Sequence, residues 1–228
     1  MKKLVAIALM AAGPAMAQDD GGAAFTGSVM VTSDYVSRGY TQSDEHPAFQ
    51  PTLNWTFANG IHFNAWASNV DFNDGGEADA EVDLTAGWGG EIDGTTFDMG
   101  AVAYLYPGAS RSLNYSYWEF YTNIGRKVGD ATVTGSFNFT PDNFGGLDTA
   151  VFFAVTVAGP VADKISLDAS IGTAQVKRAS GQDYEYWSIG ATYALGFADV
   201  SLRYHDTNAS ACAGLCDARA VLSLSKGF

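Results

Sequence analysis

The feature that most constrains this sequence is an alternation of apolar and polar residues that recurs along almost its whole length. It is clear in FQPTLNWTF at 49–57, in ATVTGSFNF at 131–139 and in KISLDASIG at 164–172. Successive side chains of a β-strand point to opposite faces of the sheet, so this period of two predicts strands with one apolar and one polar face. Nothing after residue 17 shows a helical period. The alternation therefore predicts an all-β protein.

Twelve alternating runs can be counted, and the connections between them alternate in length. Short turns lie at 58–60, 89–94, 128–130, 159–163 and 196–197, and longer polar loops lie between the other runs. This order puts all short turns at one end and all long loops at the other. It predicts a closed antiparallel transmembrane β-barrel of about 12 strands, with short periplasmic turns and longer extracellular loops. The runs are 26–38, 48–57, 61–71, 80–88, 95–106, 115–127, 131–140, 149–158, 164–174, 184–195, 198–207 and 218–228.

The first 17 residues are typical of a secretory signal peptide. Lys2 and Lys3 precede a short apolar stretch, and Ala15 and Ala17 form a small-residue cleavage signal. Such a segment is too short to span a membrane as a helix, so we expect a signal peptide at 1–17 and one barrel domain at 18–228. The chain carries 25 acidic against 12 basic residues, which argues against binding nucleic acid.

The alternation alone does not say which face lies inside, because a soluble lipocalin-like barrel or sandwich also alternates. Three features favour a membrane. Charged residues make up only 16% of the chain, below the roughly 25% of soluble domains. The last strand closes on an aromatic residue, Phe228, which resembles the assembly signal read by the barrel assembly machinery. Aromatic residues of the apolar face also gather near strand ends, as in the two girdles of outer-membrane barrels: Phe57, Trp88, Phe97 and Tyr193 at one end, and Trp118, Phe137, Trp187 and Tyr204 at the other.

If lipid and lipopolysaccharide cover the apolar face, the polar face lines the lumen. Strand parity puts Asp34 and Arg38 on one face of the first strand, near the outer mouth. More acids than arginines face inward, and carboxylate-lined pores favour cations. We therefore expect a narrow, cation-leaning channel for small polar or cationic solutes. The pore-lining candidates are Asp34, Arg38, Glu81, Asp83, Asp98, Glu119, Asp168, Arg203 and His205, and the aromatic lumen candidates are Trp66, Tyr104, Tyr117, Tyr121 and Tyr186.

Two alternatives stay open. Twelve strands lie between the filled eight-stranded barrels and the open sixteen-stranded channels, so the lumen could also be plugged, leaving a structural or surface-interaction barrel. A barrel enzyme is a weaker alternative: the histidines are His46, His62 and His205, and no serine lies two residues after His62 as a barrel phospholipase would have. We expect no catalytic residues, no cofactor and no metal site. Cys212 and Cys216 are expected to form a disulfide in a surface loop.

The sequence resembles the TorF-like putative porins, a family of small proteobacterial barrels. The resemblance rests on SDYVSRGYTQS at 33–43, WASNVDF at 66–72, EVDLTAGWGGE at 81–91, YLYPG at 104–108, YWEFY at 117–121, TPDNF at 140–144 and the closing LSLSKGF. It implies a porin-like protein in the outer membrane of a Gram-negative bacterium. It supplies no catalytic or ligand residue, no solute and no oligomeric state.

Overall fold

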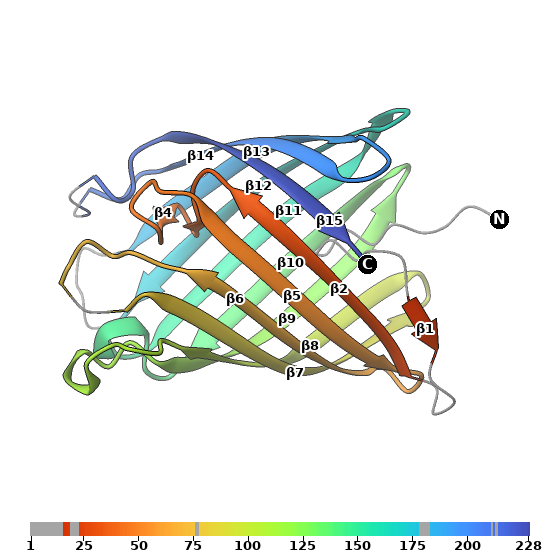
Figure 1. Ribbon diagram of the computed structural model, residues 1–228. Helices are drawn as coiled ribbons and strands as arrows, with labels where there is room; N and C mark the ends of the chain where they lie inside the picture. Colours follow the sequence, from red (N-terminus) through yellow and green to blue (C-terminus); the bar gives the residue numbers. More distant parts are fainter. Residues whose placement is uncertain (1–15, 19–22, 76–77, 178–182, 211, 213) are drawn as a thin grey trace.

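The computed structural model describes residues 16–18, 23–75, 78–177, 183–210, 212 and 214–228, and in it twelve antiparallel strands form a closed barrel (Figure 1). Each strand pairs with its neighbours in chain order, and β2 completes the ring by pairing with both β5 and β15. The predicted fold class is confirmed. The strands are β2 (Ala23–Thr32), β5 (Ala48–Phe57), β6 (Ile61–Asn69), β7 (Ala80–Ile92), β8 (Thr95–Leu105), β9 (Tyr117–Val128), β10 (Ala131–Thr140), β11 (Ala150–Ala162), β12 (Ile165–Val176), β13 (Tyr184–Ala194), β14 (Asp199–Thr207) and β15 (Arg219–Gly227).

The remaining elements are small. The strand β1 (Met16–Gln18) pairs with the start of β2, and β3 (Val36–Ser37) and β4 (Tyr40–Thr41) form a separate hairpin. Two 3₁₀ turns, η1 (Arg111–Leu113) and η2 (Phe144–Gly146), lie in long loops. No helix in the described part of the chain is long and apolar enough to cross a membrane. The expected signal peptide, apart from its last two residues, lies outside the described residues.

The barrel is apolar outside and polar inside. Phe63, Ile171 and Leu222 are 46%, 59% and 55% exposed on the outer face. The buried side chains of the wall are mostly polar, among them Thr52, Asn64, Ser68, Thr85 and Thr140. So large an exposed apolar surface is stable only where lipid covers it. The prediction that the apolar face points outward is confirmed, and a soluble barrel is excluded.

Long loops and short turns lie at opposite ends, as predicted, and the C-terminus lies at the short-turn end (Figure 1). Two strands run further than the sequence predicts. The glycine pair at 89–90 suggests a turn, but β7 continues to Ile92 and the chain turns at Asp93 and Gly94, whose φ angles are 50° and 74°. An Asp-Gly pair with two positive φ angles matches the twist of a two-residue hairpin, so it determines the turn. Similarly, β11 continues to Ala162, and the chain turns at Asp163 and Lys164, of which Lys164 has a φ angle of 69°.

The barrel closes where its last residue meets its first long strand. The backbone N–H groups of Gly27 and Phe228 each donate to the carbonyl oxygen of the other, at 2.9 Å. The Phe228 ring lies over Gly27 on the outer face, and a Cβ atom added to Gly27 would lie 2.5 Å from it. A side chain at position 27 and the terminal ring therefore cannot occupy this place together.

The first predicted strand is wrong in its second half. The alternation predicts a strand over 26–38, but β2 ends at Thr32, and the chain leaves the barrel wall until β5 begins at Ala48. We call residues 33–47 loop 1. Its tip is formed by Arg38 and Gly39, at φ 48° and 88°, between β3 and β4. Asp34 and Arg38 therefore do not share the face of a strand.

Candidate functional site in the barrel lumen

Loop 1 folds into the lumen, where Gly39 at its tip lies against Tyr186 on β13 and Thr207 on β14, and the Arg38 side chain extends further. The strand opposite β2 in the ring of twelve is β10, six strands away in either direction. The Arg38 guanidinium donates to Glu119 on β9, with Nη1–Oε2 at 2.9 Å and Nη2–Oε1 at 2.7 Å. It also lies 3.6 Å from the ring centroid of Phe152 on β11. Since β9 and β11 flank β10, the tip of loop 1 is bound to the far wall.

The partner of Arg38 is fully buried. The Glu119 side chain is 0% exposed, and its Oε1 also accepts hydrogen bonds from Asn138 at 2.8 Å and from the Tyr104 hydroxyl at 3.4 Å. Burial alone would lower the pKa of Arg38, but the Glu119 carboxylate outweighs it and raises that pKa well above its ordinary value. The Arg38 guanidinium therefore keeps its charge beside this buried carboxyl group.

The base of loop 1 is held by the last strand of the barrel. Asp34, which is 6% exposed, accepts hydrogen bonds from Arg219 on β15 at 3.1 Å and from the hydroxyls of Thr41 and Ser43 at 2.5 and 3.0 Å. Arg219 is also 3.4 Å from Glu45 of the same loop. These contacts fix both sides of the hairpin at its base.

Neighbouring loops also hold loop 1 through their backbones. The Thr41 N–H donates to Leu215 in loop 6 (208–218), and the Asp71 N–H in loop 2 (70–79) donates to Gln42, both at 2.8 Å. Leu215 lies inside the ring formed by the Cys212–Cys216 disulfide, which the structure contains. Loop 1 is therefore fixed to the neighbouring loops and is not a free connection between strands.

A cluster of aromatic side chains covers the loop end beside loop 1. Phe72 of loop 2 contacts Tyr106 and Tyr115 of loop 3 (106–116) and Phe144 of loop 4 (141–149), with ring centroids 5.0–5.7 Å apart. Tyr35 of loop 1 packs against this cluster. Burial and a hydrogen bond to the Asp74 carboxylate raise the pKa of Tyr115 to about 12.

Two carboxyl groups on β7 lie at the edge of loop 1. Glu81 is 2% exposed, and its Oε1 accepts a hydrogen bond from the Tyr35 hydroxyl at 3.3 Å. The Oε2 atom of Glu81 and the Oδ1 atom of Asp83 are buried without a donor among the described residues. Asp83 lies between two aromatic residues of the neighbouring strands, Trp66 on β6 and Tyr104 on β8.

Two other predicted lumen acids, Asp98 and Asp168, lie nearer the short turns. Asp168 on β12 and Arg203 on β14 form an ion pair, with Nη2–Oδ1 at 2.7 Å, across Gly190 of the strand between them. This pair is possible because Gly190 has no side chain in its path.

On β8, Asp98 accepts a hydrogen bond from Tyr121 at 3.1 Å and lies 3.5 Å from His62. His205 lies beside Arg219 across the β14–β15 pair, and the Tyr186 ring occupies the space over Gly172.

The lumen has more acids than its arginines can pair. Arg38, Arg203 and Arg219 each contact a carboxylate, on Glu119, Asp168 and Asp34 respectively. Three predicted lumen acids, Glu81, Asp83 and Asp98, have no arginine or lysine partner among the ion pairs of the described chain. The lumen therefore holds more carboxyl groups than arginines.

Sequence patterns miss two residues of this site. Alternation puts Tyr35 on the lipid face, but its ring lies 5.2 Å from Trp66 inside the barrel, because the strand ends before it. Phe152 is buried in the lumen and its neighbour Phe153 is exposed outside. Two adjacent phenylalanines give no alternation signal, so only the parity of the flanking residues could have assigned them.

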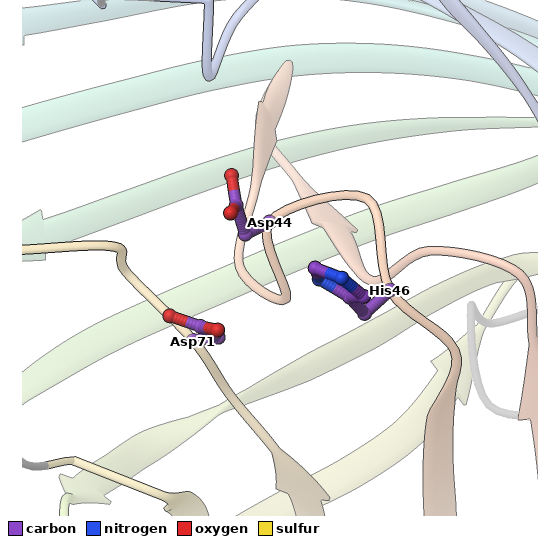
Figure 2. Close-up of side chains that lie close together, drawn as sticks. All are labelled: Asp44, His46 and Asp71. Atoms are coloured by element: carbon purple, nitrogen blue, oxygen red, sulfur yellow. The ribbon is translucent and has the colours of Figure 1, made fainter.

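A group of three possible metal ligands lies at the mouth, although the sequence predicts none. Ligand atoms of Asp44, His46 and Asp71 lie within 4.8 Å of one another, from loop 1 and the start of loop 2 (Figure 2). His46 and Asp71 are exposed, and exposed acidic groups of this kind are stable without an ion. Asp71 is distant in sequence from the other two, so spacing does not reveal the group.

The fold and the lumen together define a transmembrane β-barrel of the outer-membrane type, closed by twelve strands and narrowed by an inward loop. The chain belongs to the family described as "Bacterial protein of unknown function (Gcw_chp)", whose model matches residues 16–228. That description does not confirm the TorF-like name suggested by the resemblance. No curated protein matches the chain at a significant level.

Solved structures share this fold at very low sequence identity. A KdgM porin has a TM-score of 0.61 at 6% identity, covering 89% of this chain and 99% of that one. The KdgM porin in complex with disordered oligogalacturonate has a TM-score of 0.59 at 6% identity, covering 90% and 99%. LpxR from Salmonella typhimurium has a TM-score of 0.52 at 9% identity, covering 89% and 99%. These likenesses show the fold alone.

Proposed function

We propose that this protein is an outer-membrane channel for the passive diffusion of small polar or cationic solutes, with loop 1 as its constriction. The observation that carries the proposal is that loop 1 folds into the lumen and its Arg38 side chain binds Glu119 on the far wall. A loop folded into a polar lumen narrows the path and sets the size of the solutes that pass.

The surplus of acids gives the channel its selectivity. With each lumen arginine already paired, Glu81, Asp83 and Asp98 leave the wall with more acidic than basic groups. Acidic side chains along a low-dielectric pore raise the local concentration of cations and lower that of anions. The channel therefore leans toward cations.

The barrel stands in the outer membrane of a Gram-negative bacterium, surrounded by lipid and lipopolysaccharide. The long loops face outward and the short turns face the periplasm, as in other barrels of this type. Phe228, at the end of the closing strand, is the signal recognised by the barrel assembly machinery. Its two hydrogen bonds with Gly27 support a role in closure.

One observation favours a second candidate, a plugged structural barrel without channel activity. The groups that hold loop 1, Asp34 and Glu119, are 6% and 0% exposed, so water has little access to them. An enzyme is not proposed. His62 has an acid neighbour in Asp98, but the hydroxyl in contact with its ring is that of Tyr121, which is not activated as a nucleophile by this arrangement.

Single-channel recording in planar bilayers tests the proposal. The full barrel should give small, uniform conductance steps with a cation-selective reversal potential in a salt gradient. Replacing the hairpin 36–41 by two glycines should enlarge the steps. The matched control replaces six residues of loop 3, 109–114, by two glycines, which leaves the residues of loop 1 unchanged and should keep the steps small.

The outcomes separate the two candidates. Steps in the full barrel that do not grow in the 36–41 variant would show that loop 1 is not the constriction. A silent full barrel with a conducting 36–41 variant would establish the plugged barrel. If neither the full barrel nor the 36–41 variant conducts, the protein is not a channel.

A further inference from the structure

Glu81 and Asp83 form a pair of carboxyl groups whose charge nothing in the described chain neutralises directly. They are two residues apart on β7, so their side chains share the lumen face. The two groups lie within hydrogen-bonding reach of each other. Neither takes part in the ion pairs of the described residues. We call them the carboxylate pair.

One oxygen of each carboxyl group lacks a hydrogen-bond donor. Glu81 Oε2 and Asp83 Oδ1 are buried, and no donor among the described residues reaches either of them. Glu81 is 98% removed from solvent, since only 2% of it is exposed. An uncompensated buried carboxylate is strongly unfavourable, and two adjacent ones repel each other. A proton or a cation between them relieves both effects.

Aromatic rings surround the carboxylate pair. The Tyr104 and Tyr117 rings stack at 4.6 Å with an interplanar angle of 13°, and the Tyr35 and Trp66 rings lie 5.2 Å apart, edge to face. Trp66 and Tyr104 occupy the positions directly beside Asp83 on the neighbouring strands. We call these rings the aromatic wall; its members are Tyr35, Trp66, Tyr104 and Tyr117.

The side chains around the carboxylate pair favour one kind of cation over another. Calcium requires six to eight oxygen ligands, and magnesium a near-octahedral set. The carboxylate pair is not part of the three-ligand group found in the described residues. Ring faces instead attract cations that carry hydrocarbon, and carboxylates beside them supply the opposite charge. The chemistry fits an ammonium group with alkyl substituents better than a bare metal ion.

We propose that the carboxylate pair and the aromatic wall form a binding site for a small organic ammonium ion. This inference deepens the proposed function, on which it rests, by naming the class of solute that the constriction selects. Because loop 1 supplies Tyr35, the site is complete only when loop 1 is docked across the lumen. Asp83 is only half-buried, so it gives the ion a route from the lumen.

Calorimetric titration of the folded barrel in detergent micelles tests the site. The probe is choline, and the comparison is 3,3-dimethylbutan-1-ol, which has the same shape without the charge. Choline should bind saturably with one site per barrel and the alcohol should not. Glu81→Gln and Asp83→Asn should each weaken choline binding by about tenfold or more, since each removes one charge facing the cation. Asp130→Asn, at an exposed acid in the short turn between β9 and β10, should leave choline binding unchanged.

Four results would overturn the site: equal binding of the alcohol, unchanged choline binding in Glu81→Gln and Asp83→Asn, displacement of choline by millimolar Mg²⁺ or Ca²⁺, or no choline binding at neutral pH. The last would mean that the carboxylate pair simply shares a proton. If Glu81→Gln does not fold, judged by gel mobility before and after boiling, then Asp83→Asn and Trp66→Phe decide. Binding does not require conduction, so a silent barrel that binds choline would remove the channel but keep the site. A conducting barrel that does not bind choline would remove the site but keep the channel.

Discussion

Replacing Arg38 by alanine should release the tip of loop 1 from the far wall. The change removes both hydrogen bonds to Glu119 and the contact with the Phe152 ring. It leaves Glu119 fully buried with only the amide of Asn138 and the hydroxyl of Tyr104 as donors. The carboxylate must then be hydrated or protonated, and hydration requires the hairpin to move away.

The size of the effect follows from the burial. Removing one partner of a buried ion pair costs about 3–5 kcal/mol, most of it the penalty of the charge left behind. At about 1.4 kcal/mol for each factor of ten, the equilibrium between docked and released tip shifts by roughly two to four powers of ten. The base of loop 1, held by Asp34 and Arg219, is untouched, so the expected change is confined to residues 36–41.

Conductance and heat resistance measure the two parts of this effect. Arg38→Ala should show larger or longer openings and a lower unfolding temperature than the natural barrel, and loss of one positive charge should increase cation selectivity. Arg38→Ala with Glu119→Ala should regain part of the lost heat resistance, because no unpaired charge remains. Arg203→Ala is the matched control: it breaks a lumen ion pair that does not touch loop 1 and should not change the openings.

If the Arg38→Ala barrel has the same conductance and the same unfolding temperature as the natural barrel, this reasoning is wrong. Lower melting with unchanged selectivity would show that Arg38 holds the loop but does not line the path of the ions.

Three further predictions concern the membrane, the closure and the loops. The barrel should migrate faster on SDS gels before boiling than after it, and recovery of the protein as a soluble periplasmic monomer would contradict the architecture. Deleting Phe228, or replacing Gly27 by valine, should lower the amount of barrel in the outer membrane, because the ring over Gly27 leaves no room for a side chain. If both variants reach the outer membrane in the same amount as the natural protein, the contact between Phe228 and Gly27 is not needed for closure. Tyr115 has a raised pKa of about 12, so its stabilising contact is fully present below the ordinary tyrosine value of about 10 and is lost as pH rises through the raised value. Phenolate absorbance compared with Tyr115→Phe should place this titration near 12, and a value near 10 would show that the hydrogen bond to Asp74 does not persist.

The barrel wall is the part of this fold that sequence predicts best. Alternation records which face of each strand meets lipid, so β5 and β10 have the predicted bounds and most other strand ends lie within two residues of prediction. Errors occur where a local backbone preference competes with the alternation. The Gly89–Gly90 pair resembles a turn but lies within β7, and the turn that follows uses Asp93 and Gly94.

For the lumen site, the sequence predicts which residues face inward but not which of them contact one another. Parity identifies Glu81, Asp83 and Glu119 as inward residues, because each lies in a regular strand. It cannot show that Arg38 pairs with Glu119, 81 residues away, since that contact depends on where loop 1 turns. It also fails for Tyr35, because alternation has no meaning once the chain leaves the sheet.

The contact between Asp34 and Arg219 has a consequence for the order in which this protein assembles. The two residues are 185 positions apart, so their hydrogen bond forms only after nearly the whole chain has been delivered to the membrane. Contacts of such long sequence separation carry a large loop-closure entropy and tend to form late. A nascent barrel that lacks β15 has no arginine for Asp34, which then keeps only the hydroxyls of Thr41 and Ser43 in its own loop. The base of loop 1 is therefore fixed only in the step that joins the last strand to the first.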